Sequence, residues 1–202
     1  MSMVSPFKLF EGNRNYFSLG FDKELAEKLQ DFFSNNENDH LWSLNTHRQK
    51  TTYALRNTES IMLRKLELKQ RLGSTIEYNQ VMEVGDSELY KKYPIFEKSI
   101  EKLNSIFKDI GASKVEYGRI FFSKFFARSS IDEHTDEGKY FSYYDRFHFV
   151  IDSPENCLFQ IKDEPVYLKT GEFAWVNNHV PHWLENRGNL NRINLIIDAR
   201  LI

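Results

Sequence analysis

The sequence predicts an α+β protein, mainly β, in which N-terminal helices pack on a C-terminal antiparallel sandwich, barrel or jelly roll. Apolar residues recur at helical spacing before about residue 112 and at every second position after it. The later apolar runs are short and are separated by turn residues, as is typical of antiparallel β folds. The chain of 202 residues shows no repeat or linker, so we expect one domain, 1–202, with a helix-rich part (1–112) and a β core (113–202).

Two helices and one strand are expected in the first part. Asp22 is a suitable N-cap for a run of apolar residues at helical spacing that ends near 35–36. Pro94 suits the first turn of a second helix, and Gly111 is a suitable residue just beyond its end. Between them, residues 60–68 (SIMLRKLEL) alternate as a strand does.

Six further strands are expected in the second part, because β-rich runs alternate there with turn residues such as Gly171. Their predicted positions are 114–126, 145–152, 157–162, 165–169, 172–177 and 192–199.

Composition excludes several classes of protein. The chain has 27 Lys and Arg against 29 Asp and Glu, so the basic surface expected of a nucleic-acid-binding protein is absent. We find neither a signal sequence nor an apolar segment of membrane-spanning length, and expect a soluble, cytoplasmic protein. Cys157 is the single cysteine, which excludes an internal disulfide and favours a small buried hydrophobe. The sequence leaves the oligomeric state open.

The stretch 132–138 (DEHTDEG) is the first candidate for a functional site. By itself it is a solvated acidic loop. His134 and Asp136, however, are two residues apart, so on a strand both side chains point to one face. An imidazole and a carboxylate can hold neighbouring positions on one metal ion there. The other acidic residues of the stretch then point to solvent, and Gly138 lets the chain turn.

A metal site needs a third ligand from elsewhere in the chain. The other histidines are His40, His47, His148, His179 and His182, of which the first two lie in a polar segment. Two imidazoles and one carboxylate leave three positions open on ferrous iron, as in non-haem iron oxygenases, whereas structural zinc takes a closed set. A 2-oxo acid commonly fills two of these positions. Arg192 is a candidate for its far carboxylate, because Arg pairs bidentately with carboxylates.

Residues 113–199 resemble the aspartyl/asparaginyl β-hydroxylase and free-proline hydroxylase family of Fe(II)/2-oxoglutarate-dependent dioxygenases. The matching segments are GRIFFSKFF, IDEHTDEG, DRFHFVI, GEFAWVNNHVPHWLENRG and NRINLIID. They follow the family's order: an H-x-D strand end, an R-x-H strand, a strand leading to the distal histidine, and an arginine on the last strand. The resemblance implies a double-stranded β-helix, jelly-roll or cupin-like, with the N-terminal helices packed on it.

The resemblance also implies a cofactor, Fe(II), two cosubstrates, 2-oxoglutarate and O2, and the residues that hold them. The implied metal ligands and catalytic residues are His134, Asp136 and His182, with His182 preferred to His179 because its distance from Arg192 fits the family. The implied 2-oxoglutarate residues are Arg192, Ser123, His148 and Arg146. The implied substrate residues are Arg146, Arg119 and Trp175, although Trp175 fits a core position equally well.

The chain departs from the family at two points. Ala127-Arg128 stands where the family usually has Pro-Gly before the metal strand. Asp136 is present, whereas the animal aspartyl β-hydroxylases lack a metal carboxylate. This moves the resemblance toward bacterial amino-acid hydroxylases and argues against a halogenase.

The expected function is hydroxylation of an amino-acid side chain, free, in a peptide or carrier-bound, coupled to decarboxylation of 2-oxoglutarate to succinate and CO2. Two alternatives remain open: desaturation or cyclisation of a small metabolite with the same cofactors, and a non-catalytic β-barrel module that binds a small acid. The expected partner is a small-molecule or peptide substrate, with no nucleic acid and no membrane.

Overall fold

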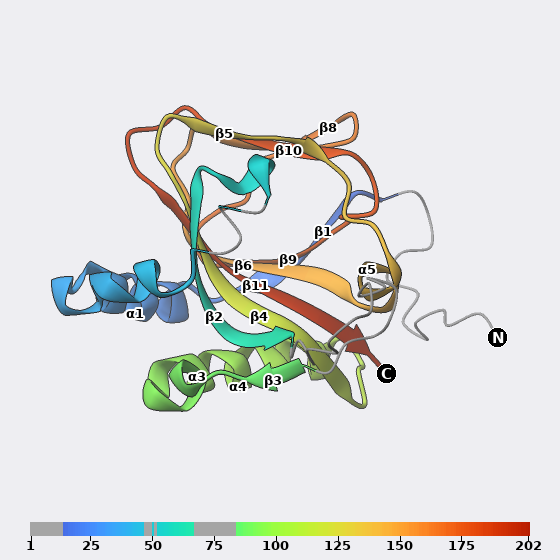
Figure 1. Ribbon diagram of the computed structural model, residues 1–202. Helices are drawn as coiled ribbons and strands as arrows, with labels where there is room; N and C mark the ends of the chain where they lie inside the picture. The colour runs from blue at the N-terminus through green and yellow to red at the C-terminus, as the bar shows by residue number, and fades with distance from the viewer. Residues whose placement is uncertain (1–13, 47–49, 51, 67–83) are drawn as a thin grey trace, which may run out of the picture.

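Two antiparallel sheets face each other in the computed structural model, which describes residues 14–46, 50, 52–66 and 84–202 (Figure 1). The major sheet has the strand order β1-β9-β6-β11-β4-β2-β3, and the minor sheet has the order β5-β10-β7-β8. Strands that are distant in sequence are therefore neighbours in both sheets. This arrangement confirms the predicted mainly β fold with a jelly-roll core.

The strands are β1 (Tyr16–Phe21), β2 (Thr58–Leu66), β3 (Val84–Asp86), β4 (Val115–Phe125), β5 (Ser129–His134), β6 (Asp145–Asp152), β7 (Cys157–Ile161), β8 (Glu164–Val166), β9 (Glu172–Val176), β10 (His182–Asn186) and β11 (Arg192–Leu201). The α-helices are α1 (Lys23–Ser34), α3 (Glu88–Lys92), α4 (Pro94–Asp109) and α5 (Lys139–Tyr143). Two 3₁₀ segments are η1 (Asn36–Leu44) and η2 (Tyr53–Leu55). No helix in the described part of the chain is both long enough and apolar enough to cross a membrane.

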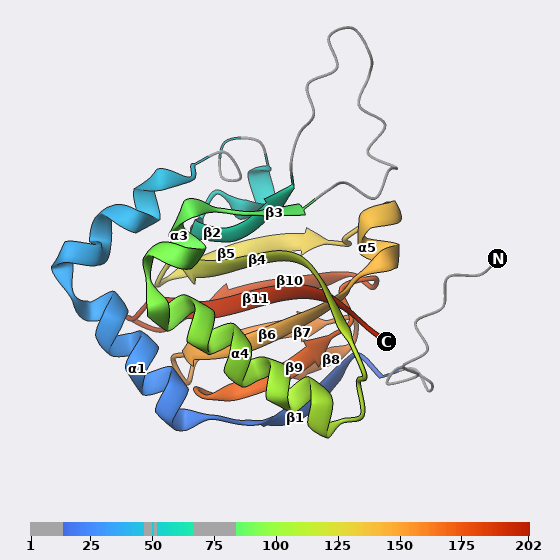
Figure 2. The same ribbon diagram turned by 90° about the horizontal axis from the view of Figure 1, so that it is seen from below.

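Both predicted helices are confirmed, and they cover the outer face of the major sheet (Figure 2). The Asp22 carboxylate accepts the Leu25 N–H at 2.9 Å and caps α1. Gly111 follows α4 with φ +99°, a conformation that glycine adopts without strain. The aromatic ring of Phe107 on α4 packs edge-on against Phe147 and Phe173, so the helix and the sheet share one core.

The major sheet is buried on both faces. One face packs against the helices and carries apolar side chains, and the other faces the minor sheet and carries the functional side chains. On β6, Phe147 and Phe149 belong to the core beneath the helices, while Arg146 and His148 point to the opposite face, toward the minor sheet. This alternation was predicted and is confirmed. On β9, Trp175 lies on the helix side with Phe173 and is 3% exposed.

The predicted strands agree with the observed ones within a few residues, except that the last two residues of the 60–68 run lie outside the described residues. Four strands were not predicted as runs: the edge strands β1 and β3 of the major sheet, and β5 and β10, which carry His134 and His182. β1, β5 and β10 carry polar residues among apolar ones and have no strong period-two pattern. β1 and β2 join the major sheet beside strands of the second half, so both parts of the chain build one sheet.

Candidate metal centre

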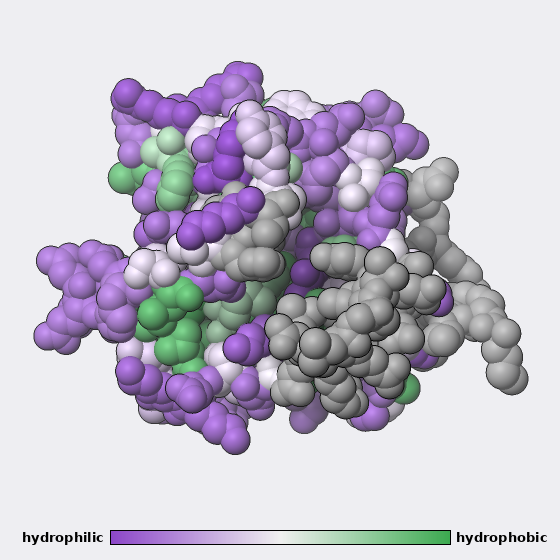
Figure 3. Space-filling model, in the orientation of Figure 1, coloured by the Kyte–Doolittle hydropathy of each residue, from purple (hydrophilic) through white to green (hydrophobic). Residues whose placement is uncertain are grey.

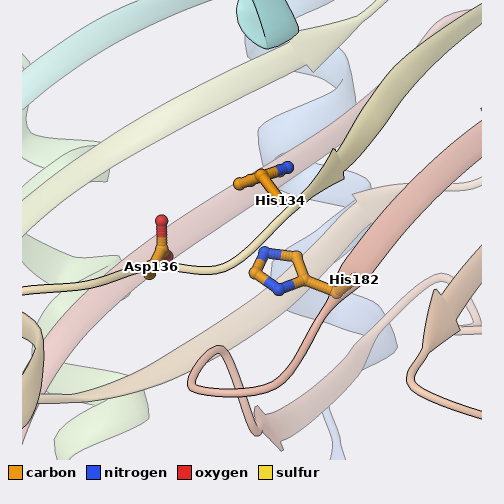
Figure 4. Close-up of side chains that lie close together, drawn as sticks. All are labelled: His134, Asp136 and His182. Atoms are coloured by element: carbon orange, nitrogen blue, oxygen red, sulfur yellow. The ribbon is translucent and has the colours of Figure 1, made fainter.

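His134, Asp136 and His182 converge at one end of the minor sheet (Figure 4). β5 ends at His134 and β10 begins at His182, and the two residues are direct partners in the antiparallel pair. Asp136 follows two residues after the end of β5. One potential ligand atom of each residue lies within 4.8 Å of the others, which suits a single metal ion.

Backbone carbonyls orient both imidazoles. Nδ1 of His134 lies 2.8 Å from the Asp132 carbonyl oxygen, and Nδ1 of His182 lies 2.9 Å from that of Val180. A carbonyl only accepts, so each Nδ1 carries the proton and each Nε2 keeps its lone pair for a metal. Burial lowers the pKa of His182 to about 4, so this ligand is neutral at pH 7.

One carboxylate oxygen of Asp136, Oδ2, is held by hydrogen bonds from neighbouring side chains. Its Oδ2 accepts hydrogen bonds from Asn178 Nδ2, at 3.0 Å, and from Arg146 Nη1. Its backbone N–H donates to the Asn178 carbonyl at 3.0 Å. Burial raises the pKa of Asp136, but Arg146 and Asn178 outweigh this effect and hold the pKa below its ordinary value. The carboxylate is therefore ionised, with Oδ1 available as a ligand atom.

Arg146 lies between two carboxylates. Besides Asp136, it contacts Asp198 through Nε at 2.8 Å and through Nη2 at 3.3 Å. The side chain is buried, and the two carboxylates raise the pKa of the guanidinium against the effect of burial. Arg146 was expected to bind a cosubstrate or substrate carboxylate. In the structure its donors are directed to two carboxylates of the protein itself.

A cavity of about 330 Å³ extends from the three converging residues into the space between the sheets. Figure 3 shows a hollow with hydrophilic and hydrophobic walls between the regions that the two sheets occupy. Its polar lining includes Arg119, Ser123, Asp136, Arg146, His148, Asn178, Arg192 and Asn194, and its apolar lining includes Phe125, Ile131, Phe159, Val176, Leu184 and Ile196.

Arg192 is a buried cation without a carboxylate partner in the described part of the chain. The residue is 1% exposed and lines the cavity. Nε donates to Asn194 Oδ1 at 3.2 Å, Nη1 lies 3.9 Å from Cys157 Sγ, and Nη2 has no hydrogen-bond partner among the described residues. An unpaired buried charge is costly, so this guanidinium is suited to an anion that enters the cavity.

His148 is a second donor directed at the cavity. Its Nδ1 lies 3.5 Å from Asn194 Nδ2, which can only donate, so Nε2 carries the proton. That Nε2 is buried and has no partner among the described residues. Burial and the charge of Arg192 lower the pKa of His148 well below its ordinary value, so the imidazole is a neutral donor.

These observations test whether Fe(II) and 2-oxoglutarate fit the site. The three converging residues offer two imidazole nitrogens and one carboxylate oxygen, the donor set of an open ferrous site. The same cavity holds two buried donors, His148 Nε2 and Arg192 Nη2, that have no partner within the described ranges of the chain, as a dicarboxylate with a far carboxylate requires. The residues present fit both groups.

The structure brings together most of the residues predicted from sequence. The three proposed ligands and the residues Arg119, Ser123, Arg146, His148 and Arg192 all line the cavity. Trp175 does not, and its predicted substrate contact is wrong: its indole lies in the helix-side core and donates to Asp145. His179 does not belong to the metal-competent group, and His47 lies outside the described residues.

Asn178, Asn194 and Asp198 are polar residues of the site that were not predicted, and neither were the cavity-lining residues Thr52 and Thr58. Asn194 and Asp198 have the same parity as Arg192 on β11 and interrupt an apolar strand, NLIIDA, at alternate positions. This alternation of polar and apolar residues could have indicated from sequence that Asn194 and Asp198 share a face with Arg192. Asn178 lies in a turn, where an asparagine is expected for local reasons, and so gave no signal.

Solved structures with a similar fold include oxygenases. An oxidoreductase of the 2OG-Fe(II) oxygenase family from Burkholderia pseudomallei has a TM-score of 0.53 at 10% identity, covering 88% of each chain. A prolyl-4-hydroxylase from Pseudomonas putida has a TM-score of 0.51 at 11% identity, covering 94% of each chain. The non-heme monooxygenase ThoJ, in a nickel complex, has a TM-score of 0.54 at 12% identity, covering 93% of this chain and 74% of that one. At these identities the similarity shows the fold.

A comparison with curated proteins shows no match. The family model for aspartyl/asparaginyl β-hydroxylase matches residues 35–200, which is more than half of the chain. This range contains every residue of the candidate site. The chain therefore belongs to the aspartyl/asparaginyl β-hydroxylase family, and it is a hydroxylase that depends on Fe(II), 2-oxoglutarate and O2.

Proposed function

We propose that this hydroxylase acts on an amino-acid side chain, free, in a peptide or on a carrier, and decarboxylates 2-oxoglutarate to succinate and CO2 in the same cycle. The observation that supports this most strongly is the shared cavity. The His-Asp-His donor set lies at one part of the cavity, and Arg192, which has no carboxylate partner among the residues that the structure describes, lines another. A metal and a dicarboxylate together use both features.

The protein residues have distinct parts in this proposal. His134, Asp136 and His182 hold the metal on one side and leave the other side open. Arg192 pairs with the far carboxylate of 2-oxoglutarate, with Ser123 beside it, and His148 donates through Nε2. When bound, Fe(II) activates O2 and supplies the oxidation. The role of the chain is to bind, orient and neutralise the reacting groups.

The apolar half of the cavity wall limits the entry of water. Phe125, Phe159 and Leu184 are almost completely buried and border the same space as the charged residues. In such surroundings each ion pair is stronger than in water, because the dielectric constant is lower. An apolar wall also protects reactive species from side reactions with solvent.

The charges in and beside the cavity favour a substrate that carries a carboxylate. The arginines are Arg119, Arg146 and Arg192, and the carboxylates are Asp136 and Asp198. Fe(II) and a dianionic 2-oxoglutarate cancel each other, so one positive charge remains. Among the described lining residues Asp136 is the only carboxylate, and it is already paired, so an ammonium group finds no free partner.

Arg119 is the best placed cation for such a substrate. Its side chain is 19% exposed, the most of the three arginines, and it packs over the Phe141 ring at 5.0 Å. The guanidinium contacts Asp198 through Nε and Nη2, which leaves Nη1 available. We therefore assign Arg119 to substrate recognition.

Succinate release from 2-oxoglutarate with ferrous iron and O2, measured across a panel of amino acids and peptides, tests the proposal. We expect succinate to form together with a product 16 Da heavier than the substrate, as insertion of one oxygen requires. His134→Ala should abolish both, whereas His40→Ala, an exposed histidine on η1, should not. Full turnover by His134→Ala would refute the metal assignment.

The products also separate the alternatives. A product 2 Da lighter than the substrate would indicate desaturation or cyclisation by the same site. Tight binding of 2-oxoglutarate without any succinate would indicate a non-catalytic binding module.

A further inference from the structure

Asp198 on β11 is a buried carboxylate at the centre of a hydrogen-bond network. It is 1% exposed. Its oxygens accept from Arg146 Nε at 2.8 Å and from Arg119 Nε and the Tyr140 hydroxyl at 3.0 Å each. Burial raises the pKa of Asp198, but the two guanidiniums lower it to about 2, so the carboxylate is ionised.

The backbone is shaped to bring these groups together. β4 pairs with β11 with a register shift opposite Asp198: Ile197 pairs with Ile120, and Ala199 pairs with Tyr117. One extra residue of β4 is therefore accommodated at 118–119, and such a bulge redirects side chains beside functional sites. The bulge includes Arg119, whose side chain contacts Asp198.

Gly118 leaves space for the hydroxyl of Tyr140. A Cβ at Gly118 would lie 2.5 Å from that oxygen and 3.2 Å from the Asp198 carbonyl oxygen. The hydroxyl donates to Asp198 and accepts the Arg119 N–H at 2.7 Å. α5, which follows Asp136 in the chain, is thereby attached to β4 and β11.

Arg146 connects this network to the proposed metal ligand. Its guanidinium is planar and rigid, so fixing Nε and Nη2 on Asp198 also fixes the direction of Nη1. Nη1 donates to Asp136 Oδ2. Without the negative charge of Asp198, the buried Arg146 and the partly buried Arg119 would be two cations near a divalent metal, and Arg146 would lose the contacts that fix its Nε and Nη2.

We propose that Asp198 is a positioning residue that holds Arg146 in the orientation that presents Asp136 to the metal, with Tyr140 completing the network. This inference rests on the proposed function only in taking Asp136 as a metal ligand. Outer-shell partners of this kind typically change metal affinity or activity by about 10- to 100-fold.

The test is a calorimetric titration of the metal-free full-length protein with Mn(II), an O2-inert substitute for Fe(II), followed by kinetics with Fe(II). Asp198→Asn keeps the shape and removes the charge, and we expect Mn(II) affinity to fall by about 10-fold or more. Tyr140→Phe keeps the charge and the ring, and we expect a smaller loss in the same direction. Tyr143→Phe, on the same helix but bonded to Glu116 at 2.8 Å, is the matched control and should bind Mn(II) normally.

The outcomes separate this inference from the proposed function. If the unsubstituted protein binds Mn(II) and turns over 2-oxoglutarate, and if folded Asp198→Asn and Tyr140→Phe bind Mn(II) as it does, Asp198 is merely structural and the inference is overturned. The inference is also overturned if the two variants lose thermal stability but keep their affinity for Mn(II). If Asp198→Asn does not fold, Tyr140→Phe decides by itself. Failure of the unsubstituted protein to bind Mn(II) refutes the metal site itself.

Discussion

Arg192→Met offers the sharpest test of how this cavity binds its cosubstrate. The substitution keeps an unbranched side chain of similar reach and removes a guanidinium that is 1% exposed and has an unsatisfied Nη2 among the described residues. Removing one partner of a buried, hydrogen-bonded charge pair costs about 2–5 kcal/mol. At about 1.4 kcal/mol per factor of ten, the affinity for 2-oxoglutarate should fall by between about 30-fold and about 4,000-fold.

The stability of the ligand-free protein should respond differently. Arg192 has no carboxylate partner in the described residues; the contacts that the substitution removes are those with Asn194, Cys157 and the Phe159 ring. Replacing even a buried ion pair by apolar groups of similar volume is often neutral or stabilising by about 1–4 kcal/mol, and a buried charge without a carboxylate partner has no ion-pair energy to lose. We therefore expect an unfolding free energy that is unchanged or higher.

Two measurements on one preparation check this reasoning: titration of Mn(II)-loaded protein with 2-oxoglutarate, and urea unfolding without ligand. Arg187→Met, an exposed arginine paired with Glu185, is the control and should leave affinity unchanged. If Arg192→Met keeps its affinity within threefold, or if the ligand-free protein loses more than about 3 kcal/mol, Arg192 is a structural cation and the reasoning is wrong.

Three further predictions concern pH, packing and metal. Burial raises the pKa of Asp145 from 3.8 to about 6, so its destabilising effect is absent below about pH 4 and complete above about pH 6. Asp145→Asn should therefore raise the unfolding free energy by up to about 3 kcal/mol at pH 8 and leave it unchanged at pH 3.5. Urea unfolding at the two pH values measures this difference, and an equal change in unfolding free energy at both would contradict the prediction. Phe107→Ala should cost about 3–5 kcal/mol in urea unfolding, because the ring is fully buried, while the folded variant keeps its Mn(II) affinity. Removal of metal by EDTA should abolish succinate formation and lower the melting temperature, and both should return with Fe(II); activity that persists in EDTA would exclude a metal-dependent reaction.

Most of the fold was predictable because its main strands and helices have strong periods. α1 and α4 were predicted from apolar spacing and caps, and β6 was predicted with its bounds. β5 and β10 were not predicted as strands, since each has few residues and a mixed pattern. Pairing with each other, rather than local propensity, makes them strands.

For the site, local sequence determined which side chains share a face. The i, i+2 spacing of His134 and Asp136, and of Arg146 and His148, was sufficient to group them. Spacing could not decide which face is the cavity side, because the major sheet is buried on both faces. The resemblance implied a substrate contact for Trp175, although a core position fitted equally well, and its strand places it on the helix side.

The sequence by itself therefore determined the mainly β fold, the H-x-D pair, and a short set of candidate histidines and arginines. Only the tertiary structure decided that His182 lies opposite His134, that Arg146 contacts protein carboxylates, and that Arg192 remains unpaired among the described residues. The physical reason is that a metal site and a charge network depend on contacts between strands distant in sequence. Those contacts follow from strand register, which depends on how whole strands bury their apolar faces and not on the site residues alone.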